Sequence, residues 1–459
     1  MNALQSAVHG VSADPRPGPG RRRLLAGVSL AYFMVLLDMT VLSVAEPDLA
    51  ASMNTSMAGL QWATIGYTVP FAALLLSAGA VADRYGADRL LRTGVVVFTA
   101  ASLLSAFAPA LWVLVILRAV MGVAAAGCVP ASMAMIGRLY PEPAARARAI
   151  ATWAATSGAA VAAGPVAGGA LVGAAGWRAV FLVNVPIGLL VLGLTLRGVR
   201  GAQDDRAGTA GRIDWAAQLS GAVVLALATD TLIAAGARQW THALVAAGVT
   251  VSALCVFVRL ERRSAAPALN RRLLRVRQVR AGLLAGAVVN FALSGALFVL
   301  PLVLQQRQYG PLQTGLAFLP LTVPFVTNPP LTGRIVARVG PRRPVAAGLA
   351  LLVGAGAVLA VALFAGAGWP WLAVGLLATG FGVSFALPAL AAAVVGAAPP
   401  DTTGAAAGTL NALRQVGATA GVAVMGAAVA FGAGWSLLVS SLACAAALCV
   451  FARPDRHAA

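Results

Sequence analysis

The chain of 459 residues is 60% hydrophobic and 10% charged, with a mean hydropathy of +0.86, whereas a soluble protein carries about 25% charged residues. All 33 basic residues are arginine, and the formal net charge is +19. The absence of lysine excludes a Walker A loop and therefore ATP hydrolysis by this chain. Four cysteines without CxxC spacing and three scattered histidines offer no metal or nucleophile cluster, so we expect no enzyme.

Apolar runs of about 20 residues, the length that crosses a bilayer, follow one another along nearly the whole chain. The predicted spans are 24–46, 58–82, 90–108, 110–137, 147–173, 178–197, 214–236, 240–259, 280–305, 312–337, 344–366, 369–396, 402–430 and 433–452. The sequence thus predicts an all-α polytopic membrane protein with fourteen transmembrane helices. An odd count is the main alternative, and 402–430 is the span most open to misinterpretation.

The arginines indicate the orientation through the positive-inside rule. With a cytoplasmic N-terminus, only Arg178, Arg238 and Arg307 fall in outer loops, and Arg118 and Arg414 fall within spans. All the other arginines fall on the inner side, so both termini are predicted to be cytoplasmic and the chain to lie in the cell membrane. This distribution favours a membrane protein over a nucleic-acid-binding protein, and no nucleic-acid partner is expected.

A loop repeat divides the chain. Gly79, Arg84, Gly86 and Arg89 recur as Gly333, Arg338, Gly340 and Arg343, at a constant offset of 254 residues. Two repeated bundles around a midplane site are typical of secondary transporters. The predicted units are a leader (1–23), a six-helix bundle (24–197), a linker with inserted helices 7 and 8 (198–279), a second six-helix bundle (280–452) and a tail (453–459).

Several strings are similar to motifs of one family. Leu37–Pro47 resembles LDxTVVNVALP, with Ser43 replacing the usual Asn and Glu46 replacing an apolar residue. The loop repeat resembles GxLaDRxGRR, and its first copy contains Gly79, Asp83, Arg84, Gly86 and Arg89 but has Ala87 and Asp88 in place of the usual basic pair. Further matches are Gln61-Trp62 with Tyr67, Arg118 in an RxxQG-like string with Met121 for Gln, Gly158 with the Gly164-Pro165-Val-Ala-Gly168-Gly169 string, Trp177-Arg178 with Asn184, and Asn411 with Arg414.

On these motifs the chain resembles the major facilitator superfamily, specifically the fourteen-helix drug:proton antiporters of the EmrB/QacA type and methylenomycin A resistance exporters. The resemblance implies a cavity lined by helices 1, 2, 4 and 5 and their repeats. The implied substrate contacts are Thr40, Ser43, Trp62, Tyr67, Asn184, Asn290 and Asn328. It also implies an antiporter motif (Gly158, Gly164, Pro165, Gly168, Gly169) that favours export over uptake, and a gating loop from Gly79 to Arg89.

Asp38 is the predicted proton-coupling residue. A carboxylate at mid-membrane costs roughly 2.5–3.5 kcal/mol and should face a cavity or a partner. Counted from helix ends near Glu46 and Ala110, Asp38 and Arg118 lie at one depth, about 12 Å below the outer surface. We therefore expect them to pair, although a purely structural ion pair is the alternative. Asp230 lies in the inserted pair of helices, which is peripheral in the family, and this position favours an incidental interfacial role.

The sequence therefore predicts a proton-coupled antiporter that exports small lipophilic drugs or antibiotics by alternating access. The expected partners are substrate, protons and the lipid bilayer. We expect a monomer with no cofactor and no metal, powered by the proton gradient. Export of an endogenous metabolite or amino acid, or a membrane protein without transport activity, are the alternatives. For Trp62 the alternative to a cavity contact is a position at the membrane interface. Arg414 lies near an inner helix end, where its side chain can snorkel to the membrane surface.

Overall fold

The computed structural model describes residues 19–196, 215–264, 271–399 and 402–453, so most of the predicted leader, part of the linker and the tail beyond Arg453 lie outside the described residues. All the elements in the described ranges are helices. They are α1 (Pro19–Met53), α2 (Met57–Tyr85), α3 (Ala87–Ala106), α4 (Leu111–Leu139), α5 (Pro143–Ala175), α6 (Ala179–Leu182), α7 (Asn184–Leu196), α8 (Trp215–Gly236), α9 (Trp240–Arg263), α10 (Arg271–Arg275), α11 (Arg277–Gln306), α12 (Pro311–Ala317), α13 (Leu319–Thr327), α14 (Pro329–Val339), α15 (Arg342–Phe364), α16 (Trp369–Ala397), α17 (Thr403–Ala428), the 3₁₀ turn η2 (Val429–Phe431) and α18 (Ala433–Ala452).

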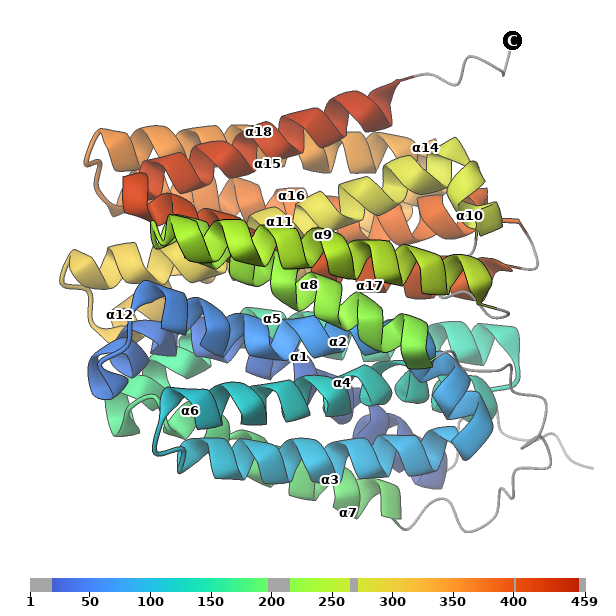
Figure 1. Ribbon diagram of the computed structural model, residues 1–459. Helices are drawn as coiled ribbons and strands as arrows, with labels where there is room; N and C mark the ends of the chain where they lie inside the picture. The colour runs from blue at the N-terminus through green and yellow to red at the C-terminus, as the bar shows by residue number, and fades with distance from the viewer. Residues whose placement is uncertain (1–18, 197–214, 265–270, 400–401, 454–459) are drawn as a thin grey trace, which may run out of the picture.

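The long helices run roughly side by side, with α1–α7 in one part of the bundle and α11–α18 in the other (Figure 1). The pair α8 and α9 packs together, and α8 contacts both α2 and α17, one helix from each part. This arrangement agrees with an all-α fold of repeated bundles. The domain boundaries stay a prediction, because packing alone does not divide the chain at named residues.

Eleven helices of the described ranges are long and apolar enough to cross a membrane, or twelve when the two parts of α2, bent by 64° between Leu75 and Ser77, count as one span. The other two predicted spans, 178–197 and 312–337, are helical but interrupted. Their count as full spans therefore stays a prediction, and so does the total of fourteen.

Prolines explain the most interrupted segment. The predicted span 312–337 forms three helices that meet at Phe318 and Asn328. Pro320 and Pro329 stand in the first turns of α13 and α14, where the missing N–H of proline costs nothing. A continuous helix would lose a hydrogen bond at each of these prolines, so the chain restarts the helix instead.

The first helix extends beyond its predicted end. The predicted span stops at residue 46, but α1 continues to Met53 with Pro47 inside it. The charged residues Glu46 and Asp48 misled the prediction, because charge usually marks the end of an apolar run. Glu46 consequently lies about 10 Å inside the end of its helix and is only 1% exposed.

The two loop repeats share a backbone geometry. Gly86 ends α2 with φ +90° and donates to the carbonyl of Ala82 at 3.0 Å, and Gly340 ends α14 with φ +76° and donates to Val336 at 2.9 Å. Both pairs of residues are separated by the same offset as the sequence repeat. A positive φ favours glycine because it has no Cβ, which gives a physical reason for the repeated glycines.

The bundle has two chemically different ends. One, called here the basic end, holds the helix termini at Arg84, Arg138 and Arg342, and here the Tyr140 hydroxyl donates to the carbonyl of Arg21. The other, called the far end, holds the C-terminal ends of α1, α5 and α11. There the backbone N–H of Trp177 donates to the Asp48 carboxylate at 2.7 Å.

Contacts between the two parts of the bundle lie between the middle and the far end. The Gln61 side chain (α2) donates to the carbonyls of Val422 and Ala423 (α17) at 3.0 and 2.9 Å, and Gln305 (α11) donates to Val44 (α1) at 3.1 Å. This set of bonds, with the Thr419–Thr68 bond at 2.8 Å, is called the far-end seam below. The bundle is closed here.

Glycines let α5 approach its neighbours on two sides. A Cβ added at Gly164 would overlap Thr40 of α1, and one at Gly168 would lie 2.5 Å from the carbonyl oxygen of Val41. A Cβ at Gly169 would overlap the carbonyl of Pro311 in α12. The close approach of α5 to α1 and α12 thus depends on small residues, as in other packed membrane helices.

Replacing Gly168 should loosen this packing. Gly168→Ala should lower the thermal unfolding midpoint in detergent, at a cost of about 1–3 kcal/mol, because a rigid backbone carbonyl faces the added methyl group. Gly173→Ala on the same helix is the matched control, since a Cβ there meets no described atom within 4 Å. Equal midpoints for the two variants would contradict the packing described here.

The basic end should face the cytoplasm. Alkaline phosphatase fused after Arg23, Arg138 or Arg453 should be inactive, and green fluorescent protein fused at the same positions should fluoresce, because arginine-rich ends are retained inside. An active phosphatase after Arg453 would show that the chain crosses the membrane an odd number of times after Arg23.

Candidate functional site

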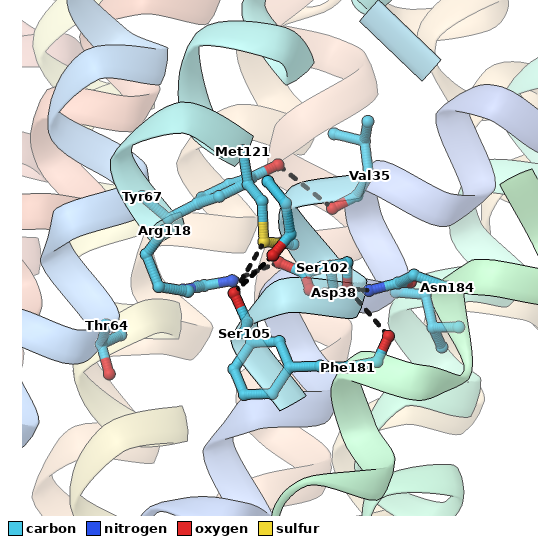
Figure 2. A network of polar contacts seen from close by, with 12 residues as sticks. Val35, Asp38, Thr64, Tyr67, Ser102, Ser105, Arg118, Met121, Phe181 and Asn184 are labelled. Carbon is cyan, nitrogen blue, oxygen red and sulfur yellow. Dashed lines mark hydrogen bonds and ion pairs between the residues drawn. The ribbon is translucent and has the colours of Figure 1, made fainter. Parts of the chain in front are cut away.

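The central feature of the first bundle is a buried ion pair. Arg118 of α4 binds a carboxylate oxygen of Asp38 of α1, and both residues are 1% exposed. Asn184, at the start of α7, donates to the other carboxylate oxygen at 2.9 Å and to the Ser102 hydroxyl at 3.0 Å. Figure 2 shows these side chains converging from separate helices. The acceptor oxygens of Asp38 are therefore both occupied.

The remaining contacts of Arg118 also come from the first bundle. Its Nε donates to the carbonyl oxygen of Ala63 at 3.2 Å, and its guanidinium lies 4.6 Å from the centroid of the Tyr67 ring. The Tyr67 hydroxyl donates to the carbonyl of Val35 at 3.4 Å (Figure 2). A guanidinium over an aromatic face gains a cation–π attraction, so the arginine is held by charge, hydrogen bonding and stacking together.

The pair forms as predicted, but the depth argument behind it used a wrong helix end. Because α1 continues to Met53, Asp38 lies fifteen residues from that end, while Arg118 lies seven residues from the start of α4 at Leu111. Equal counts from the helix ends are therefore not what brings them together. The cost of leaving either charge unpaired in the bundle is a sufficient reason for the contact.

A small cavity adjoins the pair. Its volume is about 30 Å³, and it lies between α1, α2, α4, α11 and α17. The lining residues are Met39, Leu42, Ser43, Glu46, Thr64, Tyr67, Thr68, Arg118, Ser294, Leu297, Phe298, Ala418 and Val422. The lining is apolar except for a few hydroxyl groups and the side chains of Glu46 and Arg118, but the volume is close to that of one water molecule.

The predicted substrate contacts in the first bundle separate into three groups. Ser43 and Tyr67 line the cavity. Thr40 instead packs on Gly164 and donates to the carbonyl of Leu36 at 3.1 Å, and Asn184 binds Asp38. Trp62 is half-buried against the hydrophobic core.

The two predicted contacts of the second bundle lie elsewhere. Asn290 accepts from Arg414 Nε at 3.4 Å, and Asn328, at the break between α13 and α14, donates to the Ser384 hydroxyl at 2.8 Å. Neither lines the central cavity. Arg414 also donates to Asn411 at 3.1 Å, so its guanidinium is held by two asparagines within the second bundle.

The predicted gating loop is exposed in this structure. Asp83, Arg84 and Arg89 are exposed, and Asp83 makes no hydrogen bond or ion pair with another described residue. The ion pair near this loop joins Asp88 and Arg92 at 3.8 Å. Asp88 replaces a basic residue of the motif, and its carboxylate pairs with Arg92 one turn later in α3.

Asp230 has a partner in the inserted pair of helices. Its carboxylate lies 2.8 Å from Nε2 of His242 in the first turn of α9, and the two side chains are 25% and 52% exposed. A partly exposed contact between α8 and α9 fits the interfacial role expected for Asp230.

Two features escaped the sequence analysis. A cavity of about 410 Å³ opens at the basic end between α11, α15, α16 and α18, with Arg277, Arg342 and Arg453 in its lining. Glu46 lies in the central cavity although the sequence analysis placed it at a helix end. Its replacement of an apolar family residue was the signal that could have identified it. The described residues contain no group of His, Cys, Asp and Glu that could hold a metal ion.

Comparisons with known proteins agree with these motifs. The profile of the Major Facilitator Superfamily matches residues 28–357 and 283–459. The chain is 33% identical over 463 residues to the methylenomycin A resistance protein of Streptomyces coelicolor, covering 96% of each chain. It is 34% identical to the multidrug resistance protein Stp of Mycobacterium tuberculosis, covering 88% of this chain and 75% of that one.

Solved structures share the fold at low sequence identity. A bacterial homologue of the human lysosomal transporter Spinster, inward-facing and unoccupied, superposes with a TM-score of 0.67 at 17% identity, covering 95% of this chain and 96% of that one. The human organic anion transporter MFSD10 gives 0.62 at 19%, covering 94% and 100%. With the motifs, the helical bundle and the matched profile in agreement, this multi-pass membrane protein belongs to the major facilitator superfamily and is a transporter.

Proposed function

We propose that this protein exports small lipophilic drugs or antibiotics across the cytoplasmic membrane in exchange for protons. Its similarity to proteins named for methylenomycin A resistance and multidrug resistance supports the drug as cargo. The GPxxGG string of α5, packed against α1 and α12, supports the direction of transport. The transporter works as a monomer without a cofactor, and the proton gradient supplies the energy.

The observation that carries the proton coupling is the buried Asp38–Arg118 pair. Protonation of Asp38 removes one charge of the pair and leaves Arg118 without its counter-ion, which is costly in a buried site. The arginine must then find another acceptor, and α4 carries it to a new position relative to α1. Binding of a proton is thereby linked to a movement of two helices that line the cavity.

The closed far-end seam supports an inward-facing state. If the basic end faces the cytoplasm, the two bundles meet on the outer side and a substrate enters from the cytoplasm. Export then requires the seam to open and the basic end to close. The gating loop and the α5 glycines (Gly158, Gly164, Gly168 and Gly169, with Pro165) serve this exchange rather than substrate recognition.

Neutralising Asp38 should uncouple the transporter. In inverted membrane vesicles, Asp38→Asn should abolish proton-driven accumulation of ethidium or another exported dye, because the side chain no longer releases a proton. Counterflow of the dye without a gradient should remain, since Asn keeps the shape of the side chain. Uphill transport by Asp38→Asn at the wild-type rate would exclude Asp38 as the coupling residue.

Asp230→Asn provides the matched control. Asp230 is also an acid within a helix, but it pairs with His242 between the inserted helices, so transport should fall by less than about twofold, as for most partly exposed ion pairs. A complete loss in this variant, with Asp38→Asn active, would move the coupling to α8. If the wild type itself exported no dye, that result would argue against drug export.

Replacing Arg118 by lysine should also inactivate the transporter. Lysine keeps the positive charge but loses the planar fork that binds Asp38 and Ala63 at once. We expect Arg118→Lys to reach the membrane in normal amounts and to lose at least about tenfold in transport rate, which corresponds to about 1.4 kcal/mol. Wild-type rates would mean that charge alone is sufficient at this position.

A further inference from the structure

The central cavity contains a second acid that the ion pair does not use. Glu46 is 1% exposed and lines the cavity with Arg118. Its Oε1 accepts from the Thr64 hydroxyl at 2.8 Å, while its Oε2 is buried without a hydrogen-bond partner among the described residues. Along α1 it lies eight residues, or about 12 Å, from Asp38.

The charges around the cavity do not balance if Glu46 is ionised. Among the described residues that line the cavity, Arg118 is the one cation, and it already binds Asp38. The titratable groups that face Glu46 are Arg118 on α4 and Tyr67 on α2, with Asp38 behind the arginine. The residues supplied by α11 and α17 do not titrate. An ionised Glu46 would give this buried cluster a net charge of −1, and a buried carboxylate oxygen without a partner is costly.

Two ligands relieve this imbalance. A proton on Oε2 makes Glu46 neutral when no substrate is bound, and the cavity volume of about 30 Å³ leaves no room for a substrate. When the cavity widens, a cationic group beside the ionised carboxylate restores the same total charge. The surrounding Leu42, Leu297 and Phe298 suit the apolar part of such a molecule.

We propose that Glu46 is the cation-recognition site of the cavity: it holds a proton when the cavity is empty and releases it when a lipophilic cation binds. This inference rests on the proposed export of small lipophilic molecules for its cation, but not for its proton. It adds a second exchangeable proton at a position where the family pattern has an apolar residue. Neutral molecules bind without displacing that proton.

The protonated carboxyl can be tested without any substrate. Dicyclohexylcarbodiimide reacts with protonated carboxyl groups in apolar surroundings, and mass spectrometry of peptides locates the adduct. In the purified full-length protein we expect labelling of Glu46 that decreases as the pH rises, and this adduct should be absent from Glu46→Gln. Absence of labelling at Glu46 at every pH, with Asp38 or another acid labelled instead, would overturn the proposal.

Cation recognition needs a second measurement. Ethidium and tetraphenylphosphonium serve as cationic probes and chloramphenicol as a neutral one, with binding and proton release both followed in weakly buffered detergent solution. The wild type should release a proton for each cation bound and none for chloramphenicol. In Glu46→Gln the release should disappear and cation affinity should fall about 10- to 100-fold, because a neutral amide no longer attracts the positive charge of either probe.

Two further variants separate folding from function. Glu46→Leu restores the apolar residue of the family pattern and should fold at least as stably as wild type, yet lose the preference for cations. Glu46→Asp keeps an ionisable carboxyl group and should retain part of the preference for cations. Cation binding without proton release in the wild type, or equal cation affinity in Glu46→Leu, would overturn the proposal. If no probe binds any variant, drug export itself fails, while the labelling result still decides whether Glu46 holds a proton.

Discussion

A charge removed from water must be neutralised by its surroundings, and this requirement organises the centre of the first bundle. The Asp38 carboxylate and the Arg118 guanidinium are both almost fully buried, and in such a place the cost of an unpaired ion exceeds the gain from any single apolar contact. Five helices contribute to the solution: α1 and α4 supply the ions, α7 an amide, α3 a hydroxyl and α2 an aromatic face. The cluster therefore fixes the relative positions of these helices.

Among the described residues, the second bundle supplies no ionisable side chain to the lining of the central cavity. It contributes Ser294, Leu297 and Phe298 of α11 and Ala418 and Val422 of α17. The loop geometry at Gly86 and Gly340 was retained in both copies. The two halves thus share a scaffold but differ in chemistry, so that any titration in the cavity takes place on one side of it.

Much of the architecture could be predicted from the sequence because long apolar runs and the placement of arginines identify membrane helices. Eleven of the fourteen predicted spans, or twelve with the bent α2, are helices long enough to cross a membrane, and the membership of the family is confirmed. The breaks at Phe318 and Asn328 and the end of α1 at Met53 could not be predicted as reliably, because prolines and charges inside a helix look the same as those at its ends. The same ambiguity concealed Glu46.

The site was predictable only in part. The need of Asp38 for a partner followed from the cost of buried charge, whereas the choice of Arg118 rested on a depth argument that used a wrong helix end. Which polar side chains line the cavity depends on helix rotation, and this is why Ser43 lines it while Thr40, three residues earlier, packs on Gly164. Asn184 was assigned to substrate, but it faces Asp38, because packing of α7 against α1 and α3 is not visible in a single sequence.

The far-end seam consists of neutral hydrogen bonds, most of them from glutamine side chains to backbone carbonyls. Each such bond contributes about 0.5–1.5 kcal/mol net, so the four together amount to a few kcal/mol. Moving a two-state equilibrium from 1:99 to 99:1 takes about 5.5 kcal/mol, which is the same order of magnitude. The hydrogen bonds of the seam are therefore weak enough for water to replace them, so they do not by themselves prevent the opening that the proposed export cycle requires.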